Sequence, residues 1–262
     1  SIEDNTSGAY YGYRASKAAL NAFGKSLAEQ PLHLEMLANL EIKFTGNFLV
    51  LFYLTELVGK EECGKATEHE VQVMRLLAPL AKLYSAKQTV AGVSEMVESF
   101  GGAGYCEDTD ISRHIRDAQL LPIWEGTTNV LCLDAVRAMI KENALPDFLQ
   151  NIKSRLHKLS HNELSDSVQR VNEAVDDIQS VVQSSWYKEM DNIETSARKL
   201  SYSLAKTMGA SLLLEHAQWS AETENEFKYI EIAKRWSDQK LVSITETNAD
   251  YLPKTKDIAL GL

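Results

Sequence analysis

The sequence predicts an all-α protein, and three observations support this fold class. Apolar residues recur at helical spacing along most of the chain. Only 13 glycines and 5 prolines interrupt its 262 residues, so long uninterrupted elements are expected. In the C-terminal part, the apolar positions step by four and three residues, which is typical of helices that pack on one another. We therefore expect a helical bundle.

Two long helices are expected in the first half of the chain. Pro31 suits the first position of a helix that runs to about Val58, because a proline there loses no intrahelical hydrogen bond, and Gly59 is a plausible stop. A second helix should run from Thr67 to Ser99, and Pro79 within it predicts a kink. The apolar stretch 48–54 is far shorter than the ~20 residues of a membrane span, so we expect a buried helix segment and no span.

The helical pattern fails between Phe100 and Gly126, where glycines concentrate. A short amphipathic piece at 111–118 interrupts this connection, and a helix restarts near Thr127. Long connections without structure are uncommon inside helical proteins unless they are used. Functional residues are therefore expected here.

The C-terminal part should form further antiparallel helices. One seam consists of Leu164, Val168, Val171, Val175, Ile178 and Val182, and the next of Ile193, Ala197, Leu200, Leu204 and Met208. A boundary is expected at 142–146, within a chain divided into residues 1–22, 23–143 and 144–262. The last unit is interpreted as structural, without chemistry of its own.

Composition excludes several classes of protein. The formal net charge of −10 argues against a protein that binds duplex nucleic acid by neutralising phosphates. Three widely spaced cysteines predict neither a disulfide framework nor a zinc cluster, and favour a reducing compartment. His157 and His161 are four residues apart, but no acidic or thiol ligand accompanies them. No metal site is expected.

Three motifs in register identify a family. The segment Phe100–Tyr105 reads Phe-Gly-Gly-Ala-Gly-Tyr, residues 116–118 read Arg-Asp-Ala, and residues 124–128 read Trp-Glu-Gly-Thr-Thr. Together with Phe23-Gly24-Lys25 and Gln30 upstream, they resemble the acyl-CoA dehydrogenase family over about residues 23–143. The rest is similar to the helical extension of the larger branch of that family. The resemblance implies a four-helix up-and-down bundle of the C-terminal type, followed by a C-terminal helical extension.

Glu125 is the catalytic base that the resemblance implies. The family removes the proton α to a thioester carbonyl while a hydride leaves the β carbon for the flavin. A carboxylate can take so weakly acidic a proton only if it is desolvated. Pro122, Ile123 and Trp124 offer an apolar wall, and Gly126 lets the substrate approach the backbone closely. Without the surrounding motifs, Glu125 would be interpreted as an exposed loop acid.

The resemblance also implies FAD as the cofactor and acyl-CoA as the substrate. Thr127 to Asn129 open a helix whose free N–H groups favour a phosphate or another polar group, although they could equally serve as helix caps. In the family, FAD spans subunits, so a homo-oligomer, dimer or tetramer, is expected. The implied flavin contacts are Phe23, Gln30, Glu98, Ser99, Phe100, Gly101, Gly102, Thr127, Thr128 and Asn129. Arg116 and Asp117 are expected to orient the loop rather than to touch a ligand.

The N-terminal segment departs from this family. Leu20 stands where members carry an arginine that reaches the FAD phosphates, and the family's two upstream domains do not precede residue 23. Residues 1–22 instead resemble the active-site helix of short-chain dehydrogenase/reductases, because Tyr13 and Lys17 form its Tyr-x-x-x-Lys pair on one helix face. No glycine-rich nucleotide loop accompanies them, so a working reductase is not expected. The simplest hypothesis is a fusion or a joining artefact.

The sequence therefore favours a flavin-dependent acyl-CoA dehydrogenase with Glu125 as base, present as a partial chain that is inactive alone. The alternative is a non-catalytic helical module that serves oligomerisation. Acyl chain length and branching stay open, as does the choice between mitochondrion, peroxisome and cytosol.

Overall fold

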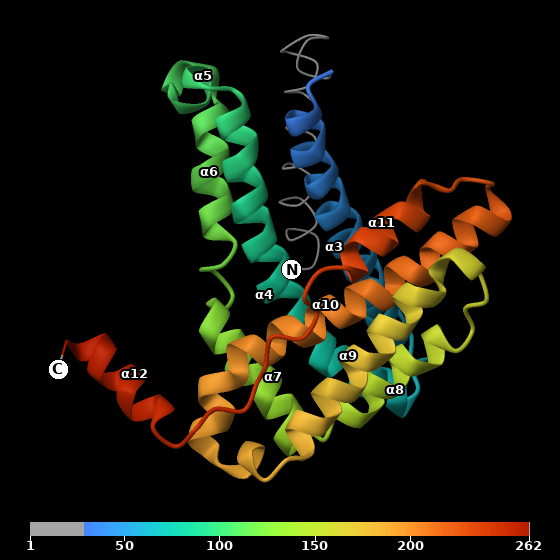
Figure 1. Cartoon of the computed structure of the whole chain (residues 1–262), viewed down its shortest axis with the longest axis vertical. Coiled ribbons are helices and arrows are strands. Elements are labelled where there is room, and N and C mark those ends of the chain that lie inside the picture. Colours follow the sequence, from blue (N-terminus) through green and yellow to red (C-terminus); the bar gives the residue numbers. More distant parts are fainter. Residues whose placement is uncertain (1–28, 262) are drawn as a thin grey trace.

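A computed structural model describes residues 29–261 (Figure 1), and within this range every regular element is a helix. The predicted all-α fold class is thus confirmed. The elements are α3 (Pro31–Glu62), α4 (Glu68–Ser99), α5 (Gly102–Tyr105), η1 (Glu107–Thr109), α6 (Ile111–Leu120), α7 (Thr128–Lys141), α8 (Leu145–Leu156), η2 (Asn162–Leu164), α9 (Ser165–Gln183), η3 (Trp186–Lys188), α10 (Met190–Thr223), α11 (Lys228–Ser237) and α12 (Tyr251–Leu260).

The ends of α3 and α4 follow local chemistry. α3 begins at Pro31 as predicted, but the predicted stop at Gly59 is wrong, because the helix continues to Glu62. The chain leaves this helix through Gly64, whose φ of 64° suits a residue without a Cβ. α4 starts after a capping box, in which the Thr67 hydroxyl accepts a hydrogen bond from the Glu70 N–H and the Glu70 carboxylate accepts one from the Thr67 N–H. α4 continues through Pro79 to Ser99 as one element.

The connection after Ser99 contains more short structure than its sequence pattern suggested. The single turn α5 and the 3-10 turn η1 precede α6, which coincides with the predicted amphipathic piece. Residues 121–127 then form the connection between α6 and α7. α5 and α6 extend together beside the C-terminal half of α4 (Figure 1).

The predicted C-terminal seams are correct. Most of the α9 seam and all of the α10 seam are buried, and the short connection through η3 reverses the chain so that the two helices pack together. α10 is also the central helix of the molecule, since it contacts α3, α4, α7, α8, α9 and α11. One apolar core therefore runs across the boundary at 142–146 instead of ending there.

Trp236 joins the two halves of the chain. This α11 side chain is only 1% exposed and lies between α3 and α10, where its indole N–H donates to the Lys206 carbonyl oxygen at 3.0 Å. A Cβ added at Gly46 would lie 2.5 Å from the indole ring, and one added at Gly209 would lie 2.8 Å from it. The indole therefore requires glycine on both helices that face it.

Charged groups also connect helices of the bundle. The Arg75 guanidinium on α4 contacts Asp134 on α7 and Glu142 beyond it, each at 2.9 Å. Arg155 on α8 stacks over the Tyr53 ring on α3, 4.1 Å from its centroid, and pairs with Glu215 on α10. Of these contacts, that of Arg155 with Tyr53 spans the predicted boundary, whereas the Arg75–Asp134 pair lies before it and the Arg155–Glu215 pair after it.

The apolar stretch in α3 is only partly buried. Val50, Leu51 and Leu54 lie in the core, whereas Phe48 and Phe52 are exposed and stack at 4.3 Å between ring centroids, so the expectation of a fully buried segment is corrected. Within residues 29–261, α3 is the one helix long and apolar enough to cross a membrane, and half of its apolar window is buried. Core helices of this kind meet the same criterion, so the absence of a span stays a prediction.

Candidate active site

The Glu125 loop, residues 121–127, connects α6 to α7. Leu121 and Pro122 are buried and anchor its start. Glu125 has a φ of 53° and Gly126 a φ of 115°, so two successive residues occupy the left-handed half of the backbone map. A Cβ at Gly126 would also lie 3.0 Å from the Leu131 side chain. This backbone turns the Glu125 side chain away from the core, and a substitution at Gly126 would strain the turn.

Lys82 on α4 holds this loop through its side-chain ammonium group. Its ammonium nitrogen donates to three backbone carbonyl oxygens, those of Leu121 at 2.9 Å, Trp124 at 2.6 Å and Gly126 at 2.8 Å. Three charge-assisted hydrogen bonds from one partly buried cation fix the loop more firmly than neutral bonds would. Burial lowers the pKa of Lys82, and the negative charge of Glu125 opposes that shift. Lys82 therefore positions the Glu125 loop, and the sequence interpretation missed this residue.

The environment of Glu125 within this chain is open. Its side chain is exposed, Ile123 beside it is 60% exposed, and Trp124 is half-buried. The predicted apolar wall is corrected in part, because Pro122 is buried and Ile123 is mostly exposed to solvent. The described residues therefore orient the carboxylate but do not remove it from water.

The start of α7 adjoins this carboxylate. Thr127 is the N-cap residue, yet its hydroxyl makes no capping hydrogen bond. Thr128 is buried, and the Asn129 side-chain oxygen accepts a long hydrogen bond, 3.5 Å, from Arg198 on α10. The first N–H groups of a helix have no partner within the helix and favour negative groups. These three residues can thus hold a polar or anionic group next to Glu125.

The glycine-rich segment forms a different surface. Gly104 packs so closely on α4 that an added Cβ would lie 2.1 Å from the Val97 carbonyl oxygen. Gly101, with a φ of 56°, and Gly102 are open, since an added Cβ would meet nothing within 4 Å at either position. Beside them lies a shallow hollow of about 860 Å³, lined in part by Glu98, Gly101, Glu107, Asp108 and Arg116.

Arg116 makes its ion pair at this hollow and not at the Glu125 loop. Its guanidinium pairs with both carboxylate oxygens of Glu107, at 2.8 and 3.1 Å, and Asp117 pairs with Arg113 at 3.4 Å. The pairing lowers the pKa of Glu107. The expectation that Arg116 and Asp117 orient a loop rather than touch a ligand stays a prediction, and the Glu125 loop itself is held by Lys82.

The implied flavin residues fall into two groups within one chain. Lys82 lies under the Glu125 loop, and Glu98 is 16 residues further along α4, about 24 Å at 1.5 Å per residue. The N-terminal end of α3, which follows Gln30, lies at the same end of the molecule as α5 (Figure 1). Glu98, Ser99, Phe100, Gly101 and Gly102 thus do not meet Thr127, Thr128 and Asn129 in this chain. Phe23 and the segment 1–22 lie outside the described residues.

The histidine pair shows no metal ligand set. His157 is exposed at the end of α8, and the buried His161 ring nitrogen Nδ1 has no hydrogen-bond partner. Among residues 29–261, no group of three or more His, Cys, Asp or Glu side chains could hold a metal ion. Cys63, Cys106 and Cys132 are free thiols.

Comparisons with known proteins cover nearly the whole chain. A family model described as "Acyl-CoA dehydrogenase, C-terminal domain" matches residues 16–140, and one described as "Acyl-CoA dehydrogenase 11 C-terminal domain-like" matches residues 143–259. Acyl-CoA dehydrogenase family member 11 of Caenorhabditis elegans is 37% identical over 229 residues, which are 85% of this chain and 37% of that protein. Putative acyl-CoA dehydrogenase AidB of Escherichia coli is 33% identical over 129 residues, 49% of this chain and 23% of that protein.

Solved structures agree with this assignment of the fold. The crystal structure of Caenorhabditis elegans ACDH-11 in complex with C11-CoA superimposes with a TM-score of 0.89 at 32% identity, over 99% of this chain and 46% of that one. An acyl-CoA dehydrogenase from Bacillus anthracis, complexed with FAD, superimposes with a TM-score of 0.65 at 19% identity, over 98% of this chain and 53% of that one. The chain thus spans about half, or less, of the length of these relatives.

Proposed function

The chain belongs to the acyl-CoA dehydrogenase family, whose C-terminal helical domain it forms, and from this premise we propose that it supplies one side of a flavin-dependent acyl-CoA dehydrogenase site. The Glu125 loop carries the proposal. Lys82 holds three carbonyl oxygens of that loop, and the backbone then directs the Glu125 carboxylate outward from the bundle. A fixed carboxylate at the surface of a rigid scaffold suits a base that meets its substrate from the other side.

Glu125 would take the proton from the carbon α to the thioester carbonyl. The pair of electrons from that C–H bond moves toward the carbonyl carbon, so the carbonyl oxygen gains negative charge, and donors placed in advance stabilise it. The part of the complete site that faces the Glu125 loop would have to exclude water, because a carboxylate surrounded by water is too weak a base for this step. Within this chain the carboxylate is exposed, which supports inactivity of the chain alone.

FAD would supply the acceptor for the hydride that leaves the β carbon. The residues at the start of α7 fit a polar edge of such a group, since the Thr127 hydroxyl is not used for capping and the first N–H groups of the helix are available. The open backbone of Gly101 and Gly102 fits a close approach. The acidic side chains of Glu98, Glu107 and Asp108 make this second surface a poorer fit for phosphate than the first.

The separation of the two groups of residues supports sharing of the cofactor between copies of the chain. About 24 Å along α4 divides them. A homo-oligomer in which Gly101 and Gly102 of one copy approach Thr127 and Thr128 of another would bring both groups to one ligand. The dimer or tetramer remains part of this proposal.

The test uses the full-length protein. The purified protein should be yellow, and undecanoyl-CoA, chosen because the nematode structure holds C11-CoA, should bleach its flavin absorbance in the absence of oxygen. Glu125→Gln should retain the bound flavin and lose the bleaching. Glu222→Gln, an exposed acid at the end of α10, is the matched control and should bleach as the wild type does.

The alternative, a helical module for oligomerisation without catalysis, makes the opposite prediction. Colourless protein that sediments as an oligomer and leaves undecanoyl-CoA unchanged would support that module. Bleaching that persists in Glu125→Gln would instead reject Glu125 as the base while leaving the family assignment intact.

A further inference from the structure

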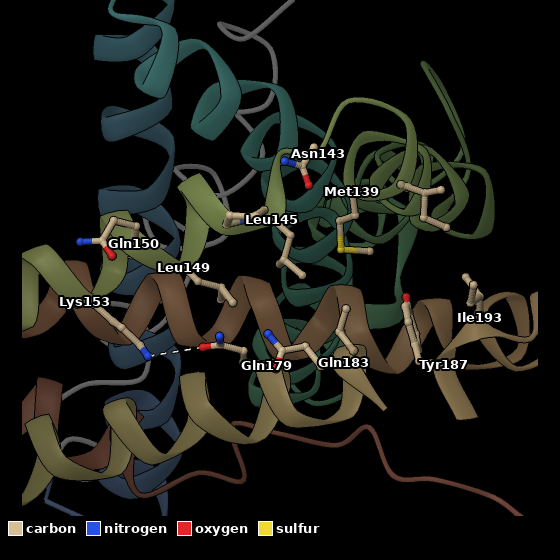
Figure 2. Close-up of a pocket in the computed structure, with 13 residues that line it drawn as sticks. Met139, Asn143, Leu145, Leu149, Gln150, Lys153, Gln179, Gln183, Tyr187 and Ile193 are labelled. Carbon is tan, nitrogen blue, oxygen red and sulfur yellow. Dashed lines mark hydrogen bonds between the residues drawn. The ribbon is translucent and has the colours of Figure 1, made fainter. Parts of the chain in front are cut away.

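A second cavity, drawn in Figure 2, is lined by residues at the C-terminal end of α7, whereas the Glu125 loop precedes the start of that helix. Its volume is about 660 Å³, and it opens between α8 and α9. Thr128 and Met139 are 11 residues apart on α7, so about 16 Å of helix separates this cavity from the loop. No residue is common to the two sites. The cavity therefore requires an explanation of its own.

The cavity is apolar at its floor and polar at its mouth. Met139, Leu145, Leu149 and Ile193 are buried and form the floor, while Gln150 and Gln183 lie exposed at the rim. Figure 2 shows these side chains arranged around one space, contributed by α7, α8, α9 and the start of α10. Apolar cavities with a few polar groups are typical of small-molecule sites.

Tyr187 provides a polar group that the protein does not use. Its side chain is only 5% exposed and lines the cavity, and its hydroxyl has no hydrogen-bond partner among the described residues. Burial raises the pKa of Tyr187 to about 12, so the hydroxyl stays protonated and can donate. A buried hydroxyl without a partner costs free energy, and a ligand that accepts its hydrogen bond removes that cost.

The charges around the cavity are already paired. The Lys153 ammonium contacts the Asp176 carboxylate at 2.8 Å and the Gln179 side-chain oxygen at 3.5 Å (Figure 2). No other charged side chain lines the cavity. An ionised ligand would lose its hydration without gaining an unpaired partner, which is costly. This arrangement favours an uncharged ligand.

We propose that this cavity binds an uncharged, largely aliphatic small molecule, whose ketone, ester or alcohol oxygen accepts a hydrogen bond from Tyr187. The aliphatic part would cover Met139, Leu145, Leu149 and Ile193, and the rim amides would contact the exposed end. The site is independent of the proposed flavin chemistry, because it uses neither Glu125 nor the start of α7.

Calorimetric titration of the 262-residue chain with 2-nonanone tests the proposal. The wild type should bind the ketone, and Tyr187→Phe, which removes one oxygen atom, should weaken binding about three- to tenfold, the range expected for one hydrogen bond. Tyr251→Phe, at a tyrosine outside the cavity, is the matched control and should bind as the wild type does. Ile140→Trp should abolish binding by blocking the rim, and since Ile140 is exposed, the fold should tolerate it.

Three outcomes would overturn the proposal. They are absence of 2-nonanone binding to the wild type, equal affinity of Tyr187→Phe and the wild type, or tighter binding of nonanoate than of 2-nonanone at neutral pH. Far-UV circular dichroism and thermal melting of each variant show whether it is folded. None of these results depends on flavin, so they are distinguishable from failure of the proposed dehydrogenase function.

Discussion

The Trp236 joint and the Glu125 loop differ in how completely the chain satisfies them. At the joint, the indole is buried between two glycines and its N–H has a partner, so every contact comes from the described chain. At the loop, Lys82 supports the backbone from one side while the Glu125 carboxylate faces solvent on the other. The described residues thus complete the packing around Trp236, whereas around Glu125 they supply only one side of the proposed site.

Removal of the indole should have the largest effect on stability. Trp236→Ala empties the joint between α3, α10 and α11, and the expected loss is about 3–5 kcal/mol of unfolding free energy. Trp219→Ala, at an exposed tryptophan on α10, should change it by less than about 1 kcal/mol. Urea denaturation of both variants measures the difference, and equal losses would show that the joint is not the centre of the core.

The glycines that face the indole offer a narrower test. Gly46→Ala and Gly209→Ala should each destabilise by about 1–3 kcal/mol, because the added methyl group overlaps the indole ring. Gly59→Ala is the matched control on α3, where an added Cβ meets nothing within 4 Å, and it should stabilise by about 0.5–1 kcal/mol. Chemical denaturation should therefore show a lower unfolding free energy for Gly46→Ala and Gly209→Ala and a higher one for Gly59→Ala. A stabilising Gly46→Ala would contradict the packing described for Trp236.

Substitution of Lys82 tests whether its side chain holds the backbone of the Glu125 loop. Lys82→Met leaves three carbonyl oxygens without their donor, and we expect a loss of about 2 kcal/mol in unfolding free energy. Hydrogen exchange should rise in residues 121–127 and stay unchanged in α9 and α10. Unchanged exchange in the loop would mean that Lys82 does not hold it.

The capping box of α4 should make a smaller, pH-dependent contribution to the unfolding free energy. The Lys60 ammonium and the Thr67 hydrogen bonds lower the pKa of Glu70 from 4.5 to about 2. Because the folded pKa lies below the unfolded one, this contribution is fully present above about pH 4.5 and is lost as the pH falls toward 2. Glu70→Gln should therefore reduce the acid dependence of the melting temperature in this window, and an unaltered pH profile would contradict the assignment.

The start of α3 and the buried seams were predictable from sequence because their causes are local, whereas the end of α3 was not. Pro31 and the period of the α9 and α10 seams are visible within a few residues. Lys82 was not predictable, since its partners are backbone carbonyl oxygens 39 to 44 residues away and any residue type presents these. The exposure of Phe52 and the cavity at Tyr187 likewise depend on which helices cover a face. Glu125 was found only through the resemblance to a family.

A double-variant cycle on the flavin-loaded full-length protein decides whether Lys82 positions Glu125 as the base. The rate of flavin reduction by undecanoyl-CoA should fall about 10²–10⁴-fold in Glu125→Gln and by a smaller factor in Lys82→Met. The double variant should be no slower than Glu125→Gln alone, because Lys82 acts through that carboxylate. If the two losses of rate multiply in the double variant, Lys82 does not act through Glu125, and if Glu125→Gln keeps the wild-type rate, Glu125 is not the base.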